Sequence, residues 1–463
     1  MPEGMLPATQ PPPGRERSRS WEAPTAALAA LALLVAFALW GGLPAPDQTP
    51  AFLAGVAVLL GVLAGLGLLT WHLLFRPLPA GHKTPRAGTL PTAIRRGLAL
   101  LLGIGSLNIM VGGFWDEVWH RQYGLPFGED FFWRPHLLMY FGFLAVTVLG
   151  FASLYLLMKR GRGTLQQRFR AQPTLGLLVM MCGLLLYVLP ADPIWHAIYG
   201  EDLTAWSIPH LLLAISFSTI MLLAATLHLS TLPPQTSRRW PSAQDALPLL
   251  MFASILLMNM QFLTTEWDQP GPLSPILQAR PEWMLPVIIA ASAALVGAMS
   301  NRALGRAGMA TLVGLIALGV RVGLIAIFNV DIMRFTGWVM ALPPLLAVDL
   351  WWALRLTRRG APPDWTSAGA AAAVGMLLAL PVLLALYPAV SIANLPAAAV
   401  VVLLAGLGGS WLGARLGAFL AAQRQPTAAD APGAARFPLA SLGALAAALA
   451  FLLVFIGTAA PPV

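Results

Sequence analysis

Long apolar runs separated by short polar segments recur along almost the whole chain. Runs of about 20 apolar residues are long enough to cross the hydrocarbon core of a bilayer as a helix. The pattern predicts about thirteen such spans. They cover residues 24–43, 52–74, 97–114, 136–157, 174–190, 209–230, 247–264, 284–300, 309–328, 337–353, 367–387, 396–420 and 437–457. We therefore expect an all-α, polytopic helical membrane protein whose main partner is the lipid bilayer.

Composition supports the same class. Of the 463 residues, 58% are hydrophobic and only 10% are charged, whereas a soluble domain carries about 25% charged residues. The single cysteine, Cys182, lies within a predicted span, which excludes an intrachain disulfide and a thiolate metal cluster. The connections between spans are roughly 20 residues at most, too short for a separate soluble domain.

The distribution of lysine and arginine predicts the orientation in the membrane. Basic residues gather before the first span and in alternate connections, as in "KRGRGTLQQRFR" at 159–170 and "RLTRRG" at 355–360. By the positive-inside rule the N-terminus is cytoplasmic and the chain is a multi-pass protein of the inner (plasma) membrane. The net charge of +9 then belongs to the cytoplasmic rim and indicates no nucleic-acid partner. The opposite, acidic face suits cations, although a solvated loop explains any one of its carboxylates equally well.

The chain divides into four predicted regions. Residues 1–22 are polar and proline-rich, as in a disordered cytoplasmic tail, and residues 23–96 hold the N-terminal transmembrane helices. Residues 97–230 form a duplicated hairpin core. Residues 231–463 add further spans with degenerate repeats, at 265–289 and 328–346, which keep Asp, Trp and Pro but have no histidine.

The duplication is visible in two segments. Residues 115–142 read "WDEVWHRQYGLPFGEDFFWRPHLLMYFG" and residues 191–214 read "ADPIWHAIYGEDLTAWSIPHLLLA". Each has Asp-x-x-x-His, then Tyr-Gly, Glu-Asp, a Trp, and Pro-His-Leu-Leu at the start of the next span. The third and fourth spans, and the fifth and sixth, are therefore two copies of one hairpin with its polar loop outside.

Each hairpin offers one carboxylate and two imidazoles. If the helices continue to the loop, Asp116 and His120 share one face, as do Asp192 and His196. His136 and His210 lie in the first turn of the returning helices, after a helix-starting proline. This mixed nitrogen and oxygen set suits copper, zinc or Fe(II). Ionisable groups at membrane depth are costly unless they are paired or bind a ligand. We expect the metal site to lie toward the outer face, with both hairpins contributing to one cluster.

Simpler interpretations exist for single residues. A histidine beside tryptophan and tyrosine is also typical of the aromatic belt at a membrane interface, and Trp115, Trp119, Trp133, Trp195 and Trp206 are interpreted as interfacial anchors. The amides within spans, such as Gln261, are expected to form hydrogen bonds between helices. Arg321 is expected to pair with an acidic group such as Asp331, or with an anionic ligand.

At the two hairpins the sequence resembles the C-type subunit of the copper membrane monooxygenases, the particulate methane and ammonia monooxygenase family, over roughly residues 97–230. Asp116, His120 and His136 match the family's first copper-binding trio. Asp192, His196 and His210 match its second hairpin, which has an Asn-x-x-x-His pair and a later histidine after the same gap. The chain departs from the family in three ways. Asp192 replaces the asparagine, the gap between His120 and His136 is longer, and about seven further spans follow.

The resemblance implies a copper protein that oxidises a small hydrophobic substrate with O₂, alone or with other monooxygenase-type subunits. Two further functions remain open from the residues. The same side chains would suit a metal-ion transporter or metal-handling permease, because internal repeats and an acidic outer face occur in transporters. Bis-histidine haem ligation is the third possibility, although an aspartate one turn before the histidine favours a borderline metal ion instead.

Overall fold

The structure is a computed structural model, and it describes ten parts of the chain: residues 47–78, 90–123, 132–199, 206–233, 241–264, 267, 283–328, 339–386, 395–424 and 437–459. Within these parts the secondary structure is helical throughout, with no strand. Ten of the described helices are long and apolar enough to cross a membrane. The predicted class, an all-α polytopic membrane protein, is therefore confirmed.

The principal helices follow the predicted spans closely. They are α2 (Thr49–Thr70), α3 (Thr92–Tyr123), α4 (Arg134–Arg160), α6 (Pro173–Tyr199), α7 (Ile208–Leu229), α8 (Ala246–Thr264), α10 (Met284–Leu304), α11 (Met309–Phe328), α13 (Leu342–Arg359), α14 (Trp365–Leu386), α15 (Leu395–Ala422) and α16 (Phe437–Gly457). Short helices are η2 (Trp71–Phe75), α5 (Leu165–Ala171) and η3 (Ala243–Asp245).

Three of the predicted spans need comment. The span at 24–43, like the tail at 1–22, lies outside the described residues. The helix α13 starts later than predicted and runs on to Arg359, so that its second half carries charged residues; it is not one of the ten apolar helices. In α16 the apolar stretch is shorter than a full span, at Leu442–Gly457.

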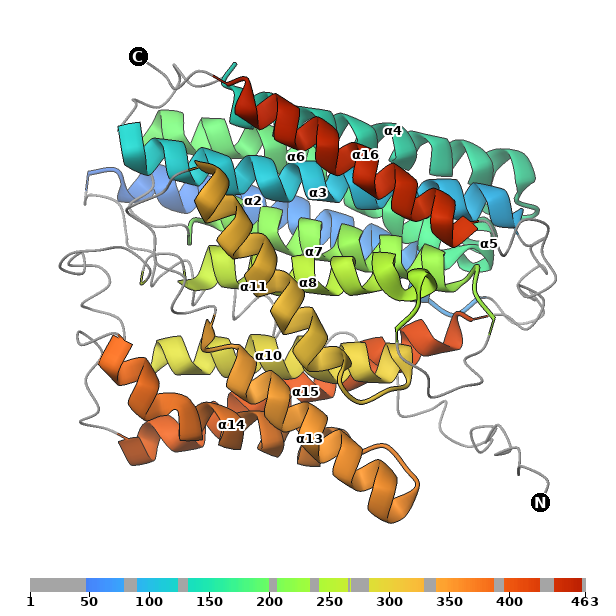
Figure 1. The fold of residues 1–463 in the computed structure, drawn as a ribbon. Coiled ribbons are helices and arrows are strands. Elements are labelled where there is room, and N and C mark those ends of the chain that lie inside the picture. Colours follow the sequence, from blue (N-terminus) through green and yellow to red (C-terminus); the bar gives the residue numbers. More distant parts are fainter. Residues whose placement is uncertain are drawn as a thin grey trace, which may run out of the picture.

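The helices form two groups, with α11 crossing between them (Figure 1). One group contains the two hairpins: α3 packs on α4 and α7, α4 packs on α6, and α7 packs on α8, while α2 lies against α6 at the edge. The other group contains α10, α13, α14 and α15, in which α10 and α15 make the most extensive contact. Helix α11 contacts α8 and α3 on one side and α10 and α13 on the other.

Glycines allow the closest helix pairs to form. A methyl group at Gly413 of α15 would collide with the carbonyl oxygen of Leu295 on α10, and one at Gly409 would collide with that of Ala291. Such backbone contact is the usual way in which membrane helices associate, because lipid tails compete equally well for larger apolar side chains. The interface between α10 and α15 therefore depends on its small residues.

One buried carboxylate joins α13 to the turn between α10 and α11. Asp349 is 5% exposed and accepts hydrogen bonds from Asn301 Nδ2 at 2.7 Å, Gly308 N at 2.8 Å and Thr311 N at 2.6 Å. The amide oxygen of Asn301 accepts a further bond from Ala310 N at 3.0 Å. The first N–H groups of a helix have no acceptor within the helix. The carboxylate of Asp349 supplies hydrogen-bond acceptors for those at the start of α11.

The two ends of the molecule differ in charge. Arginines gather where α4, α10 and α13 end, at Arg160, Arg302, Arg358 and Arg359. The C-terminal end of α3 and the N-terminal end of α4 lie at the opposite end of the bundle (Figure 1). These four arginines are thus separated from the ends of α3 and α4 that carry the Asp-His motif.

Candidate metal centre

Helix α3 brings the first two candidate ligands onto one face. The helix runs without a break to Tyr123, past the end of its apolar stretch. Asp116 and His120 are therefore one turn apart, and His120 Nε2 lies 3.6 Å from Asp116 Oδ1. The expectation that the helix extends through this Asp-His pair is confirmed.

The returning helix α4 supplies the third candidate ligand. Trp133 is its N-cap residue and Pro135 occupies the first turn, where a missing N–H costs nothing. His136 follows directly, and its Nε2 atom lies 2.9 Å from Asp116 Oδ1. One ligand atom from each of Asp116, His120 and His136 lies within 4.8 Å of the others. The structure thus brings together the trio that the sequence singled out.

The trio depends on close contact between α3 and α4. Gly112 faces the first turn of α4, where an added methyl group would lie 2.9 Å from the carbonyl oxygen of Pro135. Deeper in the pair, a methyl group at Gly142 would lie 2.6 Å from the carbonyl oxygen of Gly105. The two backbones therefore touch near the candidate ligands. Glycine at positions 112 and 142 allows this short distance between the helices, because a larger side chain at either position would collide with the opposite backbone.

The spacing of the donors suits a single metal ion. Two ligands at about 2.0–2.2 Å from a tetrahedral ion lie roughly 3.3 Å apart, and the two histidine–aspartate distances, 2.9 and 3.6 Å, fall on either side of that value. The side chains of Asp116, His120 and His136 are 21%, 30% and 16% exposed, so the site is neither sealed nor fully solvated. Three ligands with partial access leave room for an exchangeable fourth ligand.

Aromatic rings surround the trio. The ring of Trp133 lies 5.2 Å from that of His120, and the ring of Tyr140, one turn further along α4, lies 5.9 Å from that of His136. Behind them Trp119 contacts both Trp133, at 5.6 Å, and Trp115, at 4.9 Å between ring centres. These rings restrict the orientation of the imidazoles and keep the inner side of the site apolar.

The interpretation of these tryptophans as interfacial anchors is wrong for three of them. Trp115, Trp119 and Trp206 are 1%, 7% and 0% exposed, so they are buried in protein. Trp206 also donates a hydrogen bond from Nε1 to the carbonyl oxygen of Phe262 at 2.9 Å. Trp195 packs edge-on against Phe52 of α2. An amphipathic ring suits a lipid interface and a helix interface equally, and the sequence does not distinguish the two.

Arg134 links the start of α4 to the C-terminal helix α16, a contact that the sequence did not indicate. Its guanidinium donates to the carbonyl oxygen of Phe455 at 3.1 Å and to Thr458 Oγ1 at 2.9 Å, and it lies over the Phe455 ring. A cation here satisfies a carbonyl at the end of α16. Its position two residues before His136 was the only feature of the sequence that could have drawn attention to it, because its partners are more than 300 residues away in the chain.

The second hairpin repeats part of this arrangement. Helix α6 continues to Tyr199 despite Pro190 and Pro193 within it. Ser207 caps α7, with Pro209 in the first turn. His210 Nε2 lies 3.3 Å from Asp192 Oδ1. The backbone of His196 is helical, one turn after Asp192, but its side chain lies outside the described residues.

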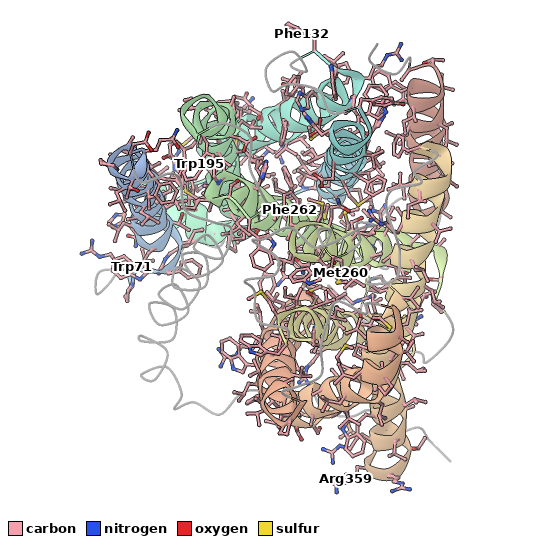
Figure 2. The ribbon with its side chains drawn as sticks, turned by 90° about the vertical axis from the view of Figure 1, so that its left-hand side faces the viewer. Trp71, Phe132, Trp195, Met260, Phe262 and Arg359 are labelled. Atoms are coloured by element: carbon pink, nitrogen blue, oxygen red, sulfur yellow. The ribbon has the colours of Figure 1, made fainter. Side chains whose placement is uncertain are left out.

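Among the described side chains, the group of three or more candidate ligands within 4.8 Å of one another is the Asp116, His120 and His136 trio. The expectation that both hairpins contribute to one cluster stays a prediction, because the side chain of His196 lies outside the described residues. Figure 2 views the helices from the hairpin end, and Phe132 before α4 and Trp195 on α6 mark different parts of the group. Asp116 meets His136, and Asp192 meets His210, because α3 pairs with α4 and α6 pairs with α7.

The other polar residues singled out from the sequence have structural partners. Arg321 of α11 is 0% exposed; its Nη1 donates to Gln261 Oε1 at 2.7 Å, and its guanidinium lies 4.4 Å from the centre of the Phe114 ring. This confirms a helix-to-helix hydrogen bond for Gln261. Asp331, the expected partner of Arg321, and most of the degenerate repeats lie outside the described residues.

Comparisons with models of known protein families, with curated proteins and with solved structures found no match for this chain.

Proposed function

We propose that this chain is an integral membrane metalloprotein that binds a first-row transition metal, preferably copper, at Asp116, His120 and His136. The observation that supports this is the convergence of one carboxylate and two imidazoles, from two helices, within 4.8 Å. Two imidazoles with one carboxylate suit copper, zinc or Fe(II) ions. Nothing in this trio requires a nucleic acid or other polar macromolecule.

The resemblance to the C-type subunit of the copper membrane monooxygenases leads us to propose oxidation of a small hydrophobic substrate by O₂ as the activity. A copper ion held here would supply the redox chemistry. The chain's own residues would do the rest: Asp116 balances the charge of the cation, and Trp133 and Tyr140 orient the two imidazoles. The buried rings of Trp115 and Trp119 keep bulk water from the inner side of the site.

A metal-ion transporter or permease is the second candidate. Its site would have to release the ion along a path across the membrane, and such a path needs ligands at successive depths. Among the described residues the trio is the one group of this kind, and it lies near the C-terminal end of α3 and the N-terminal end of α4. This favours a fixed site.

The test is metal analysis of the detergent-purified protein beside three variants. We expect about one bound first-row metal ion per trio, reduced severely in His120→Ala and in Asp116→Ala. The matched control is His72→Ala. That histidine is exposed, and within the described part of the chain its ring contacts only Arg76, at 3.2 Å. His228 is unsuitable as a control, because it is 1% exposed and its Nε2 lies 2.9 Å from the carbonyl oxygen of Gln244.

Equal metal content in all four proteins would refute the metal assignment. A second outcome is that the wild type holds a metal that His120→Ala loses, but consumes no O₂ with any reductant. That result would refute the oxidation of a substrate by O₂ and leave the metal site standing. Uptake of the metal into vesicles by the wild type, abolished in His120→Ala, would support the transporter instead.

A further inference from the structure

A pocket lies at the opposite, basic end of the molecule. The ends of α10, α13 and α15 line this open pocket of about 330 Å³, a volume at the lower end of the range for small-ligand sites. Its lining is apolar except for one guanidinium. The lining residues are Arg302, Gly305, Trp352, Leu356, Pro362, Ala418 and Ala421.

Arg302 gives the pocket its chemical character. It lies in the last turn of α10 and is half-buried. Within the described part of the chain its guanidinium forms no hydrogen bond or ion pair, whereas Arg306 pairs with Asp245 at 3.3 Å and Arg355 with Asp364 at 3.4 Å. A guanidinium presents several donors that match the oxygens of a phosphate group. Arg302 is therefore available to a ligand, and the ligand it suits is an anion.

The local charge favours an anion despite the helix ends. The C-termini of α10 and α13 each carry about half a negative charge, which opposes an anion. Both last turns are closed by glycine: Gly305 N donates to Asn301 O, and Gly360 N donates to Leu356 O. Arg302, and the exposed Arg358 and Arg359 two and three residues after Leu356, each carry a full positive charge, against the single carboxylate of Asp349 beside Asn301. The sum of these charges is positive.

The walls of the pocket suit hydrocarbon. Trp352 is 3% exposed and forms part of the inner wall together with the half-buried Leu356. A ligand with an anionic head and an apolar chain would therefore place its head at Arg302 and its chain against Trp352 and Leu356.

We propose that this pocket binds the phosphate headgroup of an anionic phospholipid, with Arg302 as its principal contact. Basic pockets between transmembrane helices are typical binding sites for such headgroups. The location agrees with the orientation expected from the sequence, which puts this end at the cytoplasmic leaflet. The inference goes beyond the proposed metal function and does not depend on it.

Native mass spectrometry of the detergent-solubilised full chain tests the proposal. Phosphatidylglycerol and phosphatidylcholine of the same chain length are titrated in parallel, and inorganic phosphate is added alone. We expect phosphatidylglycerol to bind more tightly than phosphatidylcholine. Arg302→Gln should weaken phosphatidylglycerol binding about fivefold, the factor that one basic side chain contributes near an anionic lipid.

Arg160→Gln is the matched control, since Arg160 is exposed at the same end but ends α4 in the other group of helices. It should leave the affinity unchanged. If Arg302→Gln does not fold, Leu356→Glu places a carboxylate on the pocket wall and should weaken binding of phosphatidylglycerol but not of phosphatidylcholine. Equal binding of the two lipids, equal effects of Arg302→Gln and Arg160→Gln, or competition by millimolar inorganic phosphate would each overturn the proposal.

Discussion

The contact between α3 and α4 makes the proposed metal site sensitive to a residue outside the proposed ligand set. An alanine at Gly112 would place its methyl group 2.6 Å from Met139 Cγ, 2.9 Å from Pro135 O and 3.0 Å from Met139 N. Met139 Cγ can rotate away, but two of the three atoms belong to the backbone of α4. Carbon contacts are favourable only from about 3.5 Å, so the start of α4 must move by roughly 0.5 Å.

The expected effect on stability is small, and the effect on metal affinity is large. Overpacking costs about 1–3 kcal/mol, and alanine regains about 0.8–1 kcal/mol over glycine within a helix, which leaves a net loss of roughly 0–2 kcal/mol. His136 follows Pro135 directly and moves with it. Because metal–ligand distances tolerate only about 0.2 Å, we expect Gly112→Ala to weaken metal binding about tenfold or more.

The neighbouring glycine provides the control. A methyl group at Gly113 would meet only Met139 Sδ, at an ordinary 3.6 Å. Gly113→Ala should therefore leave metal affinity unchanged and gain up to about 1 kcal/mol of stability. The assay is a competition titration with a chromogenic chelator, beside thermal unfolding of the same samples in detergent. Equal metal affinities for Gly112→Ala and Gly113→Ala would refute the reasoning that backbone contact sets the position of His136.

Substitutions at two other residues test the stability of the fold and metal binding at the second hairpin. Asp349→Ala leaves two backbone N–H groups and one side-chain amide without their acceptor. Each buried donor without a partner costs about 1–3 kcal/mol, so the free energy of unfolding should fall by at least about 3 kcal/mol. Asp364→Ala, which removes an exposed carboxylate, should cost only about 1 kcal/mol, and equal losses would contradict the role of Asp349. Asp192→Asn removes the negative charge beside His210, so Zn(II) titration should show weaker binding at the second hairpin and unchanged binding at Asp116, His120 and His136. Unchanged Zn(II) stoichiometry and affinity would show that Asp192 binds no metal.

Several elements follow from local sequence. The apolar runs are long enough to require helices, because a backbone in lipid must satisfy its own hydrogen bonds. The prolines at 135 and 209 start α4 and α7, as their fixed backbone angle predicts. The spacing of Asp116 and His120 places both on one face of any helix. For these features, no knowledge of distant contacts is needed.

The contacts between helices were decided by the tertiary structure. The sequence by itself determined the class of protein, the helices and the candidate ligands of each hairpin. It could not show that Trp115 is buried or that Arg134 reaches α16. In lipid, apolar faces do not select their neighbours, so helices pair where glycines let backbones touch and where distant polar groups meet, as at Gly112 and Asp349. Those choices depend on residues far apart in the chain, and only the folded molecule brings them together.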